Sequence, residues 1–251
     1  MPARRPVSAP HPGGQRHDIA LGTGRSTVAT RYVVSDSRGA PGATLLVLAH
    51  GAGAGQYHPF MTSMAARLAA RGIEVVTFDF PYVHAGRKVP DRAPVLEACF
   101  AAVADWAVRQ HDGPVTRLIL GGKSMGGRMA THLGAAGFTT LDGSGPGLAG
   151  LVALGYPLHP PGRPEQLRDA HLPSITMPVL MVQGSRDTFG TPAELAPVVA
   201  RMTAPVTVHV VEGGDHSFAV GRTPRDTVLD TVADVVAGWA GALAPRLDPN
   251  G

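Results

Sequence analysis

Hydrophobic residues along this chain form short continuous runs, and these alternate with segments in which apolar residues recur every three or four positions. A continuous apolar run is typical of a parallel strand that is covered on both faces. Two further strands are expected near the N-terminus, at residues 18–21 and 27–34. The buried strands are predicted at residues 44–49, 74–80, 117–121, 148–155, 179–184 and 206–211.

Helical periodicity fills the intervals between these strands. Residues 60–68 and 95–106 each carry an apolar stripe on one helical face. Further helices are expected at residues 124–136 and from Thr223-Pro224 onward, where the threonine would cap the helix and the proline would occupy its first turn. Strands that alternate with helices favour an α/β fold, with a mostly parallel central sheet and helices on both faces.

The chain has 251 residues and no internal linker, so we predict one domain at residues 16–243. Residues 1–15 are rich in proline, glycine and arginine without apolar periodicity, and we expect a disordered tail there. Residues 244–251 are expected to form a C-terminal tail. The connection between residues 155 and 179 is short and proline-rich, so little or no cap domain and an open cleft are expected.

Composition argues against several classes of partner. The formal net charge is only +3, and the basic residues are scattered, so no nucleic-acid partner is expected. Cys99 is the single cysteine, and the 11 histidines lack metal-ligand spacing, so neither a disulfide framework nor a metal site is expected. The sequence shows neither an apolar run long enough for a membrane helix nor a signal peptide, which favours a cytoplasmic protein without membrane contact.

Glycine is frequent, with 32 residues, and one glycine cluster carries a chemical motif. Gly122-Lys123-Ser124-Met125-Gly126 matches G-x-S-x-G between a predicted strand and a predicted helix. In a nucleophile elbow the serine occupies such a strained turn, and we expect the glycines to let the chain bend without clashes. Ser124 is therefore the candidate nucleophile.

Two segments resemble cofactor-binding motifs, but each lacks a glycine that its motif requires. Gly122-Lys123-Ser124 resembles the end of a P-loop, but the glycine required five positions earlier is Arg117. The loop His50-Gly51-Ala52-Gly53-Ala54-Gly55 resembles a dinucleotide fingerprint, but Gln56 and His58 occupy the third glycine position in its two frames. No cofactor is therefore expected.

The same glycine loop suits an oxyanion hole. Acyl transfer needs backbone N–H donors from the residue after the serine and from the loop after an earlier strand. Met125 would supply the first donor and Ala52 the second, with Gly53 as the alternative.

A serine nucleophile also needs a base and an orienting acid, in the chain order serine, acid, histidine. Asp187 follows the strand at 179–184, and His216 lies in the glycine-rich loop after the strand at 206–211. Both loops leave the carboxyl edge of the sheet, where the elbow also lies. Asp215 and Asp79 remain alternative acids, whereas His159 and His171 are interpreted as surface residues and His209 as a sheet residue.

Five segments together resemble the α/β-hydrolase superfamily, and more narrowly its dienelactone-hydrolase-related branch. That branch also holds testis-expressed protein thirty and the related subunit of the non-specific-lethal chromatin complex. The resemblance implies an α/β-hydrolase fold and a serine hydrolase without a cofactor, although dienelactone hydrolases proper use cysteine where this chain has Ser124. The segments are LAHGAGAGQYHPFM, FDFPYVHAGRKVPD, GGKSMGGRMA, MVQGSRDTFG and GGDHSF.

The expected reaction is hydrolysis of a small-molecule carboxylic ester or thioester through an acyl-enzyme. A non-catalytic interaction module of the same fold, or an acyltransferase or peptidase with the same residues, remains an alternative. Lys123, with Arg87 and Lys88, could favour an anionic substrate, or Lys123 could simply pack at the sheet edge. His58 could line the cleft or simply begin a helix.

Overall fold

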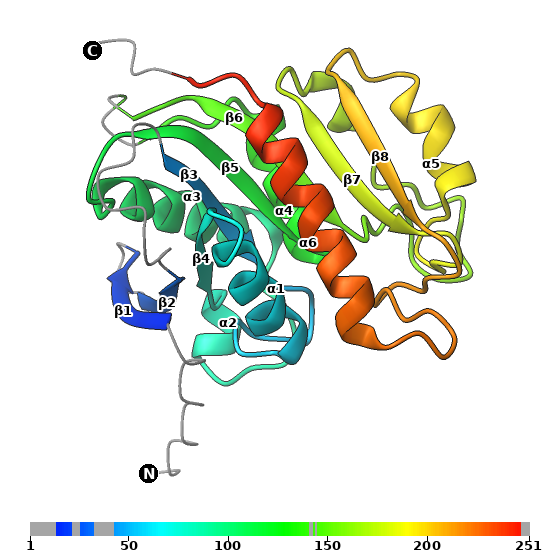
Figure 1. The fold of residues 1–251 in the computed structure, drawn as a ribbon, viewed down its shortest axis with the longest axis horizontal. Coiled ribbons are helices and arrows are strands. Elements are labelled where there is room, and N and C mark those ends of the chain that lie inside the picture. Colours follow the sequence, from blue (N-terminus) through cyan, green and yellow to red (C-terminus); the bar gives the residue numbers. More distant parts are fainter. Residues whose placement is uncertain (1–13, 22–25, 33–42, 141–142, 144, 247–251) are drawn as a thin grey trace.

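The computed structural model describes residues 14–21, 26–32, 43–140, 143 and 145–246. Strands in these ranges form one eight-stranded sheet in the order β1-β2-β4-β3-β5-β6-β7-β8 (Figure 1). From β4 to β8 all neighbours are parallel, and β1 and β2 extend the sheet in antiparallel fashion. The strands are Gly14–Ala20 (β1), Ser26–Tyr32 (β2), Ala43–Ala49 (β3), Glu74–Phe78 (β4), Val115–Lys123 (β5), Leu148–Leu154 (β6), Val179–Gly184 (β7) and Val206–Val211 (β8).

Helices cover both faces of the sheet. α1 and α6 pack together on one face, whereas α3 and α4 lie on the other (Figure 1). The predicted α/β class, with a mostly parallel sheet between helices, is confirmed. The helices are Pro59–Ala69 (α1), Pro81–His84 (α2), Ala93–Arg109 (α3), Met125–Ala135 (α4), Pro192–Val199 (α5) and Arg225–Ala242 (α6), with a 3-10 turn at Leu172–Ser174 (η1).

The middle strand β3 shows why its apolar run is continuous. Leu45 and Val47 belong to the core beneath α3 and α4, whereas Leu46 and Leu48 belong to the core beneath α1 and α6. Successive side chains of a strand point to opposite faces, and both faces here are buried. The strand therefore has no solvent-facing position that a polar residue would occupy.

Several sequence-based boundaries differ from the structure, as at β4, which ends at Phe78 rather than Phe80, and at β5, which begins at Val115. Gly14 and Gln15, placed in the N-terminal tail, pair with Tyr32 and Arg31 in β1. Thr223 does not cap α6: the N-cap residue is Pro224, whose extended backbone (φ −55°, ψ 133°) delays the first helical residue. The C-terminal tail begins in contact with the domain, because the Arg246 N–H donates to the Thr116 carbonyl at 2.7 Å. Residues 1–13, 33–34 and 247–251, to which other predictions refer, lie outside the described residues.

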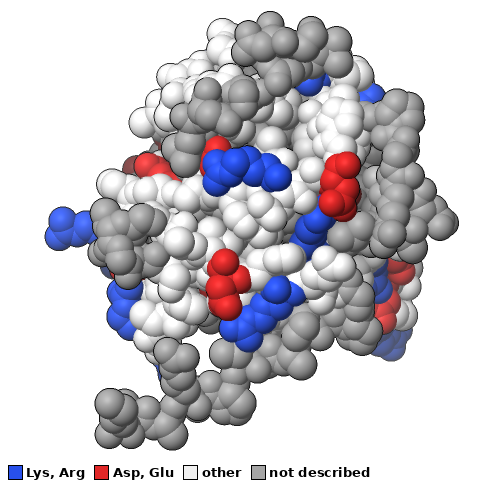
Figure 2. All heavy atoms as spheres, turned by 90° about the vertical axis from the view of Figure 1, so that its left-hand side faces the viewer, with Lys and Arg blue, Asp and Glu red and all other residues white. Residues whose placement is uncertain are grey.

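The connection from β6 to β7 contains η1 as its helical element within the described residues, so the expectation of little or no cap domain is confirmed. On the face shown in Figure 2, basic and acidic side chains occur in small mixed groups on a mostly uncharged surface. Among the described residues we find no helix with the length and apolar character needed to cross a bilayer, and no cluster of potential metal ligands.

Candidate active site

Ser124 lies in the turn between β5 and α4, at the carboxyl edge of the sheet. Its backbone has φ 51° and ψ −116°, and within the described part of the chain only Phe218 is another non-glycine residue with positive φ. Such a conformation costs about 1–3 kcal/mol and needs surrounding structure to hold it. The Ser124 N–H donates to the Leu154 carbonyl at 3.0 Å, which ties the strained turn to β6.

The glycines around Ser124 allow close packing across the turn and against the end of β3. None of Gly121, Gly122, Gly126 and Gly127 has a positive φ, so the unusual backbone conformation belongs to Ser124 itself. A Cβ on Gly127 would lie 2.7 Å from the Gly122 carbonyl oxygen, which confirms that these glycines let the chain turn without clashes. A Cβ on Gly122 would lie 2.6 Å from the Ala49 carbonyl oxygen, and a Cβ on Gly126 would clash with the same oxygen. The first turn of α4 can therefore rest directly on the end of β3.

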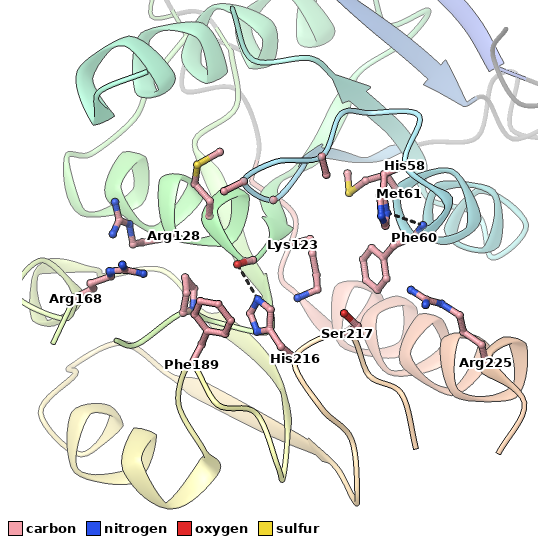
Figure 3. A pocket seen from close by; sticks show the side chains of 16 residues that line it. His58, Phe60, Met61, Lys123, Arg128, Arg168, Phe189, His216, Ser217 and Arg225 are labelled. Carbon is pink, nitrogen blue, oxygen red and sulfur yellow. Dashed lines mark hydrogen bonds between the residues drawn. The ribbon is translucent and has the colours of Figure 1, made fainter. Parts of the chain in front are cut away.

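Ser124, His216 and Asp187 form a hydrogen-bonded chain. His216 Nε2 is 2.9 Å from Ser124 Oγ, a contact that is dashed in Figure 3. His216 Nδ1 is 2.8 Å from Asp187 Oδ2. Because the carboxylate accepts a hydrogen bond from Nδ1–H, Nε2 is unprotonated and can accept the hydroxyl proton. The structure thus brings together the three residues that the sequence selected, although they are separated by up to 92 positions.

Asp187 is fully buried, and its carboxylate has further donors. The Phe189 N–H donates to Oδ1 at 2.8 Å, and Gln183 Nε2 donates to Oδ2 at 2.9 Å. The Gln183 amide also accepts from the Tyr156 N–H and donates to the Gly190 carbonyl. Sequence analysis missed Gln183, although it is a lone polar residue in the apolar run VLMVQG.

The proposed oxyanion donors both lie at this site. Ala52 and Met125 line the same pocket as Ser124, whereas Gly53 is not among its lining residues. Met125 is the first residue of α4, so its N–H has no acceptor within the helix. Of the two candidate residues in the glycine loop, Ala52 is therefore the one that lines the pocket.

His50 shapes the loop that carries Ala52. Its Nδ1–H donates to the Gly51 carbonyl at 2.8 Å, and its Nε2 accepts from the Phe80 N–H at 3.1 Å. Both ring nitrogens are thus used within the protein, and burial lowers the pKa of His50. Neutral His50 ties the loop to the segment after β4, a contact that sequence analysis did not assign.

The two alternative acids have structural tasks instead. Asp215 Oδ1 accepts from the N–H groups of Ser217 and Ala219, which shapes the loop that carries His216. Asp79 Oδ1 accepts from the Gln56 N–H at 2.8 Å and so holds the glycine loop. Asp187 therefore remains as the acid that contacts His216.

Among the described residues, His216 is the histidine that hydrogen-bonds Ser124, and three others have different contacts. His159 is only 4% exposed, which corrects its assignment to the surface: its N–H donates to the Phe189 carbonyl, so the connection folds inward. His171 is half-buried and bonds Thr131 at 2.9 Å, and burial lowers the pKa of His171 to about 4. His58 caps α1 by accepting from the Phe60 N–H and also lines the pocket, so its two interpretations are compatible.

The pocket in front of Ser124 has a volume of about 450 Å³. Figure 3 shows His58, Phe60, Met61 and Arg225 on one side of His216 and Phe189, Arg128 and Arg168 on the other. Sequence analysis gave no role to Arg128, Arg168 and Arg225, although Arg128 lies in the segment GGKSMGGRMA that carries the family resemblance.

Lys123 lies inside this pocket rather than at the outer edge of the sheet. Its Nζ is buried without a hydrogen-bond partner in the described residues, 5.8 Å from the Phe60 ring centroid and 5.5 Å from that of Phe218. Burial lowers the pKa of Lys123 to about 8. Arg87, in contrast, pairs with Asp91, and neither Arg87 nor Lys88 is among the lining residues.

A strained serine between a strand and a helix, next to a histidine that is paired with a buried aspartate, is the arrangement of α/β-hydrolases. A family model described as alpha/beta hydrolase domain matches residues 42–242, and the chain belongs to this family.

Solved structures confirm the fold at low sequence identity. A dienelactone hydrolase from Anabaena variabilis is similar with a TM-score of 0.68 and 17% identity, covering 92% of this chain and 99% of that one. An esterase from Pyrococcus furiosus has a TM-score of 0.70 and 16% identity, with 94% and 96% covered. A serine hydrolase without a lid from Xanthomonas campestris has a TM-score of 0.66 and 17% identity, with 96% and 100% covered.

Proposed function

We propose that the protein is a serine hydrolase that cleaves a carboxylic ester or thioester, with Ser124 as nucleophile, His216 as base and Asp187 as orienting acid. The observation that carries the proposal is the hydrogen-bonded chain from Asp187 through His216 to Ser124 Oγ. The esterase and serine-hydrolase neighbours of the same fold support it.

In the first half of the reaction, His216 Nε2 accepts the Ser124 hydroxyl proton while Oγ attacks the acyl carbon. The N–H groups of Ala52 and Met125 stabilise the oxyanion, and one such donor is worth about 3 kcal/mol in the transition state. The bond to the leaving oxygen or sulfur then breaks, and His216 returns the proton to the leaving alcohol or thiol.

Water completes the cycle. His216 takes a proton from a water molecule while the water oxygen attacks the acyl carbon, and the Ser124 ester bond then breaks. The carboxylic acid leaves, and Oγ recovers its proton from the imidazolium. Throughout, Asp187 stabilises the imidazolium, because its own carboxylate is held by Gln183 and the Phe189 N–H.

The test combines active-site labelling with turnover. A fluorophosphonate probe should add one adduct mass to the wild type and none to Ser124→Ala, and 4-nitrophenyl acetate and an acetyl thioester should be hydrolysed by the wild type alone. Ser174→Ala, which removes an exposed serine of η1, is the matched control and should label and hydrolyse like the wild type.

An unlabelled wild type that hydrolyses neither substrate would contradict the proposal and favour a non-catalytic module of this fold. Labelling without hydrolysis, followed by transfer of the acyl group to an added amine or alcohol, would instead identify an acyltransferase with the same three residues.

A further inference from the structure

Two arginines form one end of the pocket. Arg128 lies on α4, one turn after Ser124, and Arg168 lies in the connection between β6 and β7. Figure 3 shows both guanidinium groups on the Phe189 side of the site, away from Lys123 and Arg225. The backbone of Arg168 is anchored, since its N–H donates to the Leu158 carbonyl and its carbonyl accepts from the Tyr156 hydroxyl at 2.6 Å.

Neither guanidinium has a counter-ion within the described residues. Arg128 Nε is buried without a hydrogen-bond partner, and no salt bridge joins Arg128 or Arg168 to an acidic side chain there. No aspartate or glutamate is among the described residues that line the pocket. Other arginines of the domain, such as Arg31 and Arg67, do have carboxylate partners.

Two unpaired guanidinium groups at one end of a pocket repel each other, and arginine cannot escape by losing its proton. Burial, followed by the charge of Arg128, lowers the pKa of Arg168. An oxyanion between them would supply the missing acceptors, because the guanidinium fork matches carboxylate and phosphate groups.

We propose that Arg128 and Arg168 bind an oxyanion group of the substrate, so that the preferred ester or thioester carries a carboxylate or a phosphate-like group. This inference rests on the proposed function. The Arg128 N–H donates to the backbone carbonyl of Ser124 at 3.1 Å, so Arg128 follows the nucleophile by one turn and the anionic group lies close to the substrate carbonyl that Ser124 attacks. The apolar part of the substrate faces Phe60 and Met61 at the opposite end.

Matched substrate pairs test the charge preference on each side of the scissile bond. For the acyl side, the charged members are the 4-nitrophenyl esters of glutarate and of 4-phosphonobutyrate, and the neutral member for both is the 4-nitrophenyl ester of methyl glutarate. For the alcohol side, these are the acetate esters of 4-hydroxybenzoate and of its methyl ester. On one side the charged member should have at least about a tenfold higher kcat/KM, as expected for charge-assisted hydrogen bonds.

Arg128→Gln and Arg168→Gln should each lower kcat/KM for the charged member about tenfold and leave the neutral member nearly unchanged. Arg163→Gln, an exposed arginine of the same connection, is the matched control and should keep the charged-to-neutral ratio of the wild type. A larger effect with the phosphonate than with glutarate identifies phosphate as the source of the anion, and the reverse identifies carboxylate.

The inference is overturned if neutral substrates have the same kcat/KM as charged substrates on both the acyl and the alcohol side. It is also overturned if the two glutamine variants lower kcat/KM equally for charged and neutral substrates. Fluorophosphonate labelling separates this failure from failure of the proposed function, because the probe reports on Ser124 and is uncharged. Calorimetry on Ser124→Ala provides a test without turnover: glutarate or 3-phosphonopropionate should bind, and adding Arg128→Gln should abolish binding. Absence of binding at millimolar concentration also overturns it.

Discussion

Lys123→Met should stabilise the protein at neutral pH. The ammonium group is buried without a hydrogen-bond partner among the described residues, and its surroundings include the rings of Phe60 and Phe218. Burial lowers the pKa of Lys123 from 10.5 to about 8, which means that the folded state disfavours the charged form. Methionine has a similar length and also packs well against aromatic rings.

The size of the effect follows from that pKa. The difference between 10.5 and about 8, at about 1.4 kcal/mol per pKa unit, is a cost to the folded state of about 3 kcal/mol. Attraction between the ammonium group and the two rings offsets about 1–2 kcal/mol of this cost. The methionine variant should therefore gain about 1–3 kcal/mol at pH 7, where Lys123 is charged in both the folded and the unfolded state.

The stability cost of burying the Lys123 charge should decrease as the pH rises. Between pH 8 and 10.5 the unfolded chain retains the Lys123 proton that the folded protein has lost, so wild-type stability rises with pH in this window. At pH 10.5 and above the cost is largely absent, and the advantage of the variant should shrink accordingly.

Urea unfolding of wild type and Lys123→Met, followed by circular dichroism at pH 7 and 10.5, measures both free energies. Lys88→Met changes the other lysine, which is exposed, and should shift stability by less than about 0.5 kcal/mol at both pH values. A variant less stable than the wild type at pH 7, or a difference that does not shrink at pH 10.5, would refute the reasoning.

Three further substitutions test the site and its support. Asp187→Asn should lower kcat about 10³–10⁴-fold because the amide favours the wrong histidine tautomer, whereas Asp215→Asn should cost less than tenfold; equal losses in a steady-state ester assay would contradict the assignment. Gln183→Leu should lower kcat more than it raises KM, since it removes a donor from the Asp187 carboxylate; an unchanged kcat would show that this donor is dispensable. Gly126→Ala should destabilise the fold by more than about 1–3 kcal/mol, because its Cβ would meet the Ala49 carbonyl; a melting temperature within 1 °C of wild type would exclude that clash.

Most of the sheet was predictable because the evidence for its strands is local. The runs at Val179–Gly184 and Val206–Val211 match β7 and β8 at both ends. The predicted start of α6 was wrong because the expected N-cap was Thr223, whereas the N-cap is Pro224, whose backbone is extended. The glycines near Ser124 do let the chain turn without clashes, as the sequence predicted, whereas their second role, the close approach of α4 to β3, cannot be seen in a local pattern.

The sequence by itself determined the α/β class and the candidate nucleophile, acid and base. Periodicity records which positions are buried, and chain order limits which acid and which histidine can follow the serine. Only the tertiary structure shows that Asp187 contacts the histidine and that Asp215 and Asp79 hold loops instead. Such choices depend on contacts between loops far apart in sequence, and no local pattern encodes them.

The charged residues of the pocket also show which features the sequence indicates and which depend on the tertiary structure. The sequence contains Lys123, Arg87 and Lys88 near recognisable motifs, and this proximity suggested an anion-binding group. The folded chain directs Arg87 to Asp91 instead and brings Arg168, from a connection without periodicity, to the same pocket as Arg128. Tertiary structure decides this because the charge of a pocket depends on how its loops fold, whereas the strands and helices beneath them follow from the burial of their own residues.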